Sequence, residues 1–97
     1  MDMESLMAQA QSLQSQISAA QDALATMHVK GVSGNGMVVV DMTGKYDVID
    51  VKIDKNALST GAENLSELVT LAYKDAKTKA DILIDKKMSE ITGATSE

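Results

Sequence analysis

The sequence predicts an α+β domain of two layers with the order α-β-β-β-α, in which long helices flank a three-stranded antiparallel sheet. Two observations carry this prediction. Apolar residues recur every three or four positions near both ends of the chain, which is typical of helices with one buried face. In the middle of the chain they alternate with polar residues, which is typical of strands. A chain of 97 residues is expected to form one domain.

The N-terminal segment, from about residue 2 to residue 28, is predicted to be one long helix. Its apolar positions are Met3, Leu6, Ala10, Leu13, Ile17, Ala20, Leu24 and Met27. The steps between them alternate between three and four residues, which is the repeat of a helix that packs along a partner. No side chain from Ser5 to Gln21 is ionisable. These uncharged positions form either an ordinary solvated face beside a buried seam or a surface for a second copy or for DNA.

The central segment, about residues 29–54, is predicted to form the three strands. Apolar Ile49, Val51 and Ile53 alternate with Asp50, Lys52 and Asp54, the pattern of a half-buried strand. The run from Met37 to Val40 is apolar at every position, so this strand needs cover on both faces. The helices cover one face, and we expect a second copy of the chain to cover the other. The residues predicted for this dimer interface are Met37, Val39, Tyr46 and Val48.

Four of the six glycines lie between Gly31 and Gly44. A glycine-rich stretch can bind phosphate, but the spacing here fits neither the dinucleotide-binding pattern nor the P-loop, and the segment that follows is a predicted strand. Gly34-Asn35-Gly36 and Thr43-Gly44-Lys45 are therefore interpreted as turns between strands, because Gly and Asn accept positive φ.

A loop is expected at residues 55–59, followed by a helical region over about residues 60–92. Its apolar stripe consists of Leu65, Leu68, Val69, Leu71, Ala72, Ala76, Ala80 and Leu83. Thr60 and Glu63 have the spacing of a capping box, and Asn64 offers a later start. The helices and strands together account for the chain as one domain, residues 1–97.

The composition argues against metal binding, membrane insertion and catalysis. The chain has no cysteine and one histidine, His28, which is expected at the end of the first helix. No apolar run approaches the roughly 20 residues of a membrane helix. The acids Asp41, Asp47, Asp50 and Asp54 are interpreted as solvated side chains rather than an acid–base pair. We therefore expect a cytoplasmic protein that is not an enzyme and that binds no cofactor and no small-molecule substrate.

Positive charge is concentrated in the final helical region, although the net charge is −5 and arginine is absent. The candidate DNA-contacting residues are Lys74, Lys77, Lys86 and Lys87. The alternative is an ordinary solvated helix, since Asp75, Asp81 and Asp85 are interspersed among these lysines. Lysines contact phosphates without reading bases, so any DNA binding is expected to be weakly sequence-specific and salt-dependent.

The order and spacing of several motifs resemble the YbaB/EbfC family of bacterial nucleoid-associated proteins. The matching residues run from Val29-Lys-Gly31 through Ser33-Gly34-Asn-Gly36 to Val38-Val-Val40, then Gly44, Val51-Lys-Ile53-Asp54, Leu65-Ser-Glu-Leu68-Val and Ala72-Tyr-Lys-Asp75-Ala76. The sequence departs from the family pattern at Lys55, where Pro is usual, and at Lys74, where Asn is usual.

This resemblance implies a homodimer whose strand regions meet and whose helices project as paired arms that embrace DNA in the nucleoid. A second interpretation of the sequence is a dimeric adaptor, which would bind a protein partner through its uncharged first helix rather than bind DNA.

Overall fold

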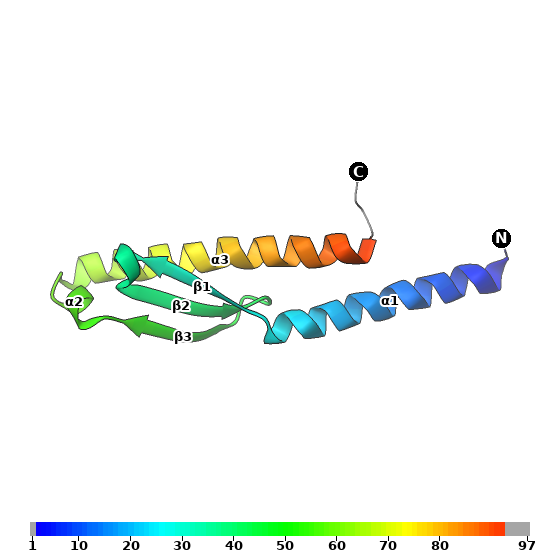
Figure 1. The fold of residues 1–97 in the computed structure, drawn as a ribbon, viewed down its shortest axis with the longest axis horizontal. Coiled ribbons are helices and arrows are strands. Elements are labelled where there is room, and N and C mark those ends of the chain that lie inside the picture. The colour runs from blue at the N-terminus through cyan, green and yellow to red at the C-terminus, as the bar shows by residue number, and fades with distance from the viewer. Residues whose placement is uncertain (1, 93–97) are drawn as a thin grey trace.

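The structure is a computed structural model and describes residues 2–92. In chain order its elements are α1 (Met3–Thr26), β1 (His28–Ser33), the 3-10 turn η1 (Gly34–Gly36), β2 (Val38–Thr43), β3 (Val48–Ile53), α2 (Lys55–Leu58) and α3 (Ala62–Thr92). The strands form one antiparallel sheet in the order β1-β2-β3 (Figure 1). This arrangement confirms the predicted α-β-β-β-α fold class.

The molecule is elongated. Its principal extents are 67 × 26 × 16 Å and its radius of gyration is 18.9 Å, whereas a compact domain of 100 residues has a radius of about 13 Å. The first part of α3 lies along the sheet, and its later turns extend beyond the sheet toward the same end of the molecule as α1 (Figure 1). The sheet therefore forms one end of the molecule, and two long helices project from it.

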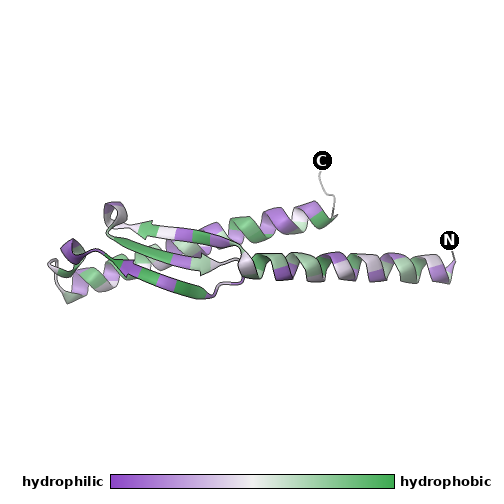
Figure 2. Cartoon of the chain, turned by 60° about the horizontal axis from the view of Figure 1, so that its bottom comes forward, coloured by the Kyte–Doolittle hydropathy of each residue, from purple (hydrophilic) through white to green (hydrophobic). Residues whose placement is uncertain are grey.

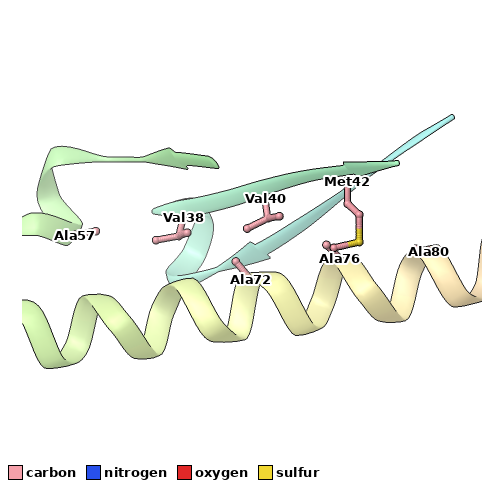
Figure 3. Close-up of a cluster of buried hydrophobic side chains, with 7 residues drawn as sticks. All are labelled: Val38, Val40, Met42, Ala57, Ala72, Ala76 and Ala80. Atoms are coloured by element: carbon pink, nitrogen blue, oxygen red, sulfur yellow. The ribbon is translucent and has the colours of Figure 1, made fainter. Parts of the chain in front are cut away.

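The core lies between β2 and α3. Val38, Val40 and Met42 of β2 are buried and point toward the alanines of α3 (Figure 3). Small residues allow a close approach of the two layers. At Gly31 of β1 an added Cβ would lie 2.0 Å from the carbonyl oxygen of Ala72, so no larger residue fits there.

The third strand is exposed along its whole length, which corrects the prediction of a half-buried strand. Apolar and polar residues do alternate along β3 (Figure 2). However, α3 packs over β1 and β2 and leaves β3 largely uncovered. As a result Val51 and Ile53 are 41% and 40% exposed, although they lie directly opposite buried residues of β2.

The first helix is shorter than predicted and is mostly uncovered. It begins after Asp2, whose carboxylate accepts a 2.8 Å hydrogen bond from the Ser5 N–H, and it ends at Thr26. His28 is therefore the first residue of β1 rather than the end of the helix, and its Nδ1 lies 3.3 Å from Asp41. Only Ala20 and Leu24 of α1 are buried, so the predicted apolar seam is covered only near the sheet.

The predicted use of positive φ is confirmed in the turn Gly34-Asn35-Gly36. In the turn that contains Gly44, the prediction names the wrong residue. Gly34, Asn35 and Gly36 all have positive φ, between 56° and 93°. In the β2–β3 turn the residue with positive φ is Tyr46, at 70°. Gly44 is buried instead, and an added Cβ would lie 2.9 Å from the Leu24 side chain. Its small size is therefore needed for packing between α1 and the sheet.

The connection between β3 and α3 also differs from the prediction. The segment predicted to be a loop contains the one-turn helix α2, which Asp54 caps by accepting a 2.9 Å hydrogen bond from Asn56 N–H. The Thr60 hydroxyl donates to the carbonyl of Ala57 and does not form the predicted capping box. The α3 helix then begins at Ala62, after Gly61 with φ of 98°.

Candidate nucleic-acid interface

The four lysines predicted to contact DNA all lie on α3, but they do not form one patch. Lys74 and Lys77 are one turn apart and face away from the buried alanines. Lys86 is twelve residues beyond Lys74, which corresponds to about 18 Å along the axis and a rotation of about 120°. Lys87 is turned toward α1, where it lines a shallow hollow with Gln16 and Ala20.

Two of the four lysines are engaged by acidic neighbours. The Nζ atom of Lys77 lies 3.7 Å from Asp81, and it also lies 5.4 Å from the ring centre of Tyr46. Lys87 lies 3.7 Å from Glu90. Lys74 and Lys86 are exposed, and within residues 2–92 neither forms an ion pair. These two lysines are thus the most available positive charges on α3.

The surrounding charge does not favour an anionic ligand along the helices. The α3 helix contains five lysines and six acidic residues, and α1 contains Glu4 and Asp22 but no lysine. The remaining lysines belong to the sheet and its connections, namely Lys30, Lys45, Lys52 and Lys55. A DNA duplex would therefore meet separate positive positions rather than a continuous basic stripe.

A polar cluster at the edge of β1 was not predicted from the sequence. The Asp75 carboxylate accepts a 2.9 Å hydrogen bond from the Val32 N–H, and Lys79 donates a 2.7 Å hydrogen bond to the carbonyl of Lys30. Lys79 also lies 3.0 Å from Asp75. The bond from Val32 and then the bond from Lys79 lower the pKa of Asp75. The i,i+4 spacing of Asp75 and Lys79 was the only sequence signal, and it does not point to β1.

The four predicted dimer-interface residues lie in different environments. Met37 ends the η1 turn and packs partly against the core, whereas Val39 lies half-buried on the sheet face opposite α3. Tyr46 belongs to the β2–β3 turn and donates a hydrogen bond to Asp81. Val48 begins β3 opposite buried Met42, because a register shift between Asp41 and Met42 changes the pairing. The structure thus does not bring the four together on one face.

The described part of the chain offers no arrangement typical of a metal site. Within residues 2–92, no three or more His, Asp or Glu side chains converge on a common point. In the same range, no helix combines the length and the apolar character needed to cross a membrane.

The sequence profile of the YbaB/EbfC DNA-binding family matches residues 1–95. This chain belongs to the YbaB/EbfC family. A nucleoid-associated protein of Bradyrhizobium diazoefficiens is 43% identical over 95% of this chain and 88% of its own length. A nucleoid-associated protein of Gluconobacter oxydans is also 43% identical, over 91% of this chain and 83% of its own length. The family resemblance inferred from the glycine framework is thereby confirmed.

A solved structure supports the fold of this YbaB/EbfC member. The crystal structure of an uncharacterized Helicobacter pylori protein matches 79% of this chain and 90% of its own chain, with a TM-score of 0.68. The two sequences are 19% identical, so the likeness concerns the fold alone.

Proposed function

We propose that this chain is a homodimeric nucleoid-associated protein that binds double-stranded DNA with low sequence specificity and without catalysis. The observation that carries this proposal is the match of nearly the whole chain to a DNA-binding family, together with relatives named nucleoid-associated proteins. The proposed place of action is the nucleoid in the bacterial cytoplasm.

The chemistry of the side chains supports weak specificity. Arginine is the commonest residue that reads guanine through two hydrogen bonds, and this chain has none. Lysine provides a point charge that suits phosphate oxygens. We propose that Lys74 and Lys86 make the strongest contacts, because neither forms an ion pair within residues 2–92. Lys77 and Lys87 contribute after leaving Asp81 and Glu90.

Dimerisation would compensate for the sparse charge of one chain. A second copy presents every lysine twice, and phosphate contacts add to binding without requiring a particular sequence. We propose that the second copy associates through the sheet, where Val39 and Val48 of the predicted interface lie on or beside the uncovered strand β3. Met37 and Tyr46 remain predicted interface residues at the two ends of β2.

The proposal is tested by measuring binding of the purified protein to two unrelated duplexes of equal length by gel shift or fluorescence anisotropy. We expect similar affinity for both duplexes and a steep loss of affinity as salt rises, since counterion release drives phosphate binding. Absence of salt-dependent binding to either duplex at low salt would contradict the DNA-binding proposal.

A dimeric adaptor is the second candidate, and one feature of α1 favours it. Met3 and Leu6 are 74% and 48% exposed, and the apolar stripe to which they belong continues to Leu13 without a lysine nearby. Such a surface suits an apolar protein segment better than a phosphate backbone. The adaptor interpretation predicts no duplex binding in the parent protein, and loss of a protein partner when Gln14 or Gln21 is replaced by a bulky charged residue.

A further inference from the structure

A small hollow lies where the two long helices meet the β2–β3 turn. Its lining includes Leu24 of α1, Gly44, Lys45 and Tyr46 of the turn, and Ile84 and Met88 of α3. Its volume of about 330 Å³ falls at the lower end of the range for small-molecule sites, which is about 300–1,000 Å³. The hollow is therefore large enough for a compact ligand.

The lining combines an apolar wall with a single charge. Leu24, Ile84 and Met88 form the wall, and a methionine side chain adapts to ligands of different shape. Lys45 is the one charged side chain among the lining residues. It is exposed, and within residues 2–92 it forms no ion pair. Apolar walls with a few placed polar groups are typical of ligand sites, and here the placed group is a cation.

The other charges beside the hollow do not replace Lys45 in this role. The carboxylate of Asp81 accepts a hydrogen bond from the Tyr46 hydroxyl, and it lies 3.7 Å from Lys77. These two charges therefore offset each other. Asp85 follows Ile84 on α3 but does not line the hollow. Among the lining residues, the charge therefore favours an anionic group on the ligand.

The turn at the mouth of the hollow is held in one conformation. The N–H of Thr43 donates a 2.8 Å hydrogen bond to the carbonyl of Asp47, and the Thr43 hydroxyl accepts from the N–H groups of Lys45 and Asp47. Tyr46 has a φ of 70°, and such conformations cluster at ligand sites and persist only where the surroundings fix them. A ligand would therefore pay little entropy to order this turn.

The hollow also adjoins the contacts that anchor α1. Only Ala20 and Leu24 of this helix are buried, and Met27 alone separates it from β1. The N–H of Gly44 donates to the carbonyls of Leu24 and Met27, both at 3.0 Å. A ligand in the hollow would touch α1, α3 and the turn at once, and so would hold the base of α1 against α3.

We propose that this hollow binds a small apolar carboxylate through Lys45. The apolar part of the ligand lies against Leu24, Ile84 and Met88, and the bound ligand fixes the base of α1. The proposal goes beyond DNA binding and depends on neither that activity nor the homodimer. Tyr46 is the residue that the hollow shares with the predicted dimer interface.

The charge requirement is tested with octanoate as the probe and octanamide as its neutral match. In NMR titrations of the isotope-labelled parent protein, octanoate should shift the amide signals of Gly44, Lys45 and Met88 most. We expect octanoate to bind about 10-fold more tightly than octanamide, because it adds a hydrogen bond between charged groups. Lys45→Gln should abolish this preference. Lys52→Gln removes the same charge from β3, opposite Val39, and should keep the preference.

The apolar wall is tested with Met88→Gln, which places a polar side chain of similar size in the lining. This variant should weaken octanoate and octanamide alike, by about 5-fold or more. Met7→Gln is the matched control, since Met7 is 59% exposed on α1 and does not line the hollow. Saturating octanoate should also slow hydrogen exchange in the last turns of α1 in the parent protein, because local opening of that helix becomes rarer.

Three results would overturn the proposal. One is the absence of octanoate binding by the folded parent protein. Another is a set of shifts spread equally over the exposed apolar residues of α1 and β3, which indicates non-specific adsorption. The third is a Lys45→Gln variant that is folded and still prefers octanoate. None of these results bears on the homodimer or on DNA binding, which sedimentation and duplex titration measure separately.

Discussion

The hydroxyl of Tyr46 donates a hydrogen bond to the carboxylate of Asp81, 35 residues along the chain. This contact links the β2–β3 turn to α3, and Lys77 joins it by packing over the tyrosine ring and pairing with Asp81. It also accounts for the positive φ of Tyr46, which is uncommon for a large residue and is maintained when surrounding contacts fix it. A candidate DNA-contacting lysine is thereby part of the structural support of a turn.

We predict that Tyr46→Phe lowers the melting temperature at neutral pH, because it removes the donor to Asp81. The hydrogen bond to Asp81 is the largest cause that raises the pKa of Tyr46 above 10.0. A raised pKa means that the stabilisation is complete below pH 10 and is lost as pH rises through the pKa in the folded state. The difference in melting temperature between parent and variant should therefore shrink above pH 10.

Tyr73→Phe is the matched control for this prediction. Tyr73 is 41% exposed, against 40% for Tyr46, but its hydroxyl makes no hydrogen bond within residues 2–92. Thermal unfolding followed by circular dichroism should give the parent melting temperature for Tyr73→Phe. Equal destabilisation by the two substitutions would show that the contact with Asp81 contributes nothing specific.

We predict that two substitutions of Asp75 behave differently. Asp75→Asn keeps an oxygen that accepts from Val32 N–H, whereas Asp75→Ala removes it and opens the β1 edge. The Ala variant should melt at a lower temperature than the Asn variant and should aggregate more readily, because both edges of its sheet are then unpaired. Melting curves and light scattering at equal protein concentration compare the two.

The pH dependence of the parent gives a further check on Asp75. Its pKa is lowered below 3.8, mainly by the hydrogen bond from Val32 and then by Lys79. The associated stability is present above pH 3.8 and is lost as pH falls through the lower pKa of the folded state. Asp75→Asn should therefore lose less stability than the parent between pH 5 and about pH 2. If the free energy of unfolding fell by the same amount in both proteins over this pH range, the assignment would be refuted.

We predict that Gly31→Ala is far more destabilising than Gly36→Ala. At Gly31 a Cβ would meet the backbone of α3 at 2.0 Å, so the two layers must separate, and we expect a loss of about 3 kcal/mol or more. At Gly36 an added Cβ would have no atom of residues 2–92 within 4 Å apart from its chain neighbours, and only the φ of 93° is unfavourable for alanine. That strain costs about 1–2 kcal/mol. Urea unfolding of both variants measures which one is the less stable. If Gly31 were only a turn residue, Gly36→Ala would be the more destabilising substitution.

These residues show which features the sequence could predict. Periodicity correctly indicated the helices and the sheet, because it depends on local geometry. The exposure of β3 depends on where α3 crosses the sheet, and local patterns do not contain that information. The bulge between Asp41 and Met42 changed the face expected for Val48. Likewise, Tyr46 rather than Gly44 has the positive φ of the β2–β3 turn. Gly44 packs against α1 and Tyr46 bonds to α3, and both helices are remote from the turn in sequence.

The candidate DNA-contacting lysines of α3 provide the last prediction, because they fall into two pairs of equal charge. We expect the double variant Lys74→Gln/Lys86→Gln to weaken binding to every duplex alike. Its salt slope should fall by about 0.9 for each DNA phosphate that the variant no longer neutralises. The variant Lys77→Gln/Lys87→Gln should have a smaller effect, since these lysines must first leave Asp81 and Glu90 to reach a phosphate.

Lys45→Gln/Lys55→Gln is the charge-matched control, because all three double variants change the net charge from −5 to −7. If long-range attraction by net charge were the whole effect, the three would bind DNA equally weakly and their salt slopes would agree. If phosphate contacts on α3 carry the binding, the control keeps the parent slope and the two α3 variants differ in the stated order. A folded, dimeric variant in which all four candidate lysines are replaced, yet which retains the parent affinity and slope, would move the DNA-binding surface away from this helix.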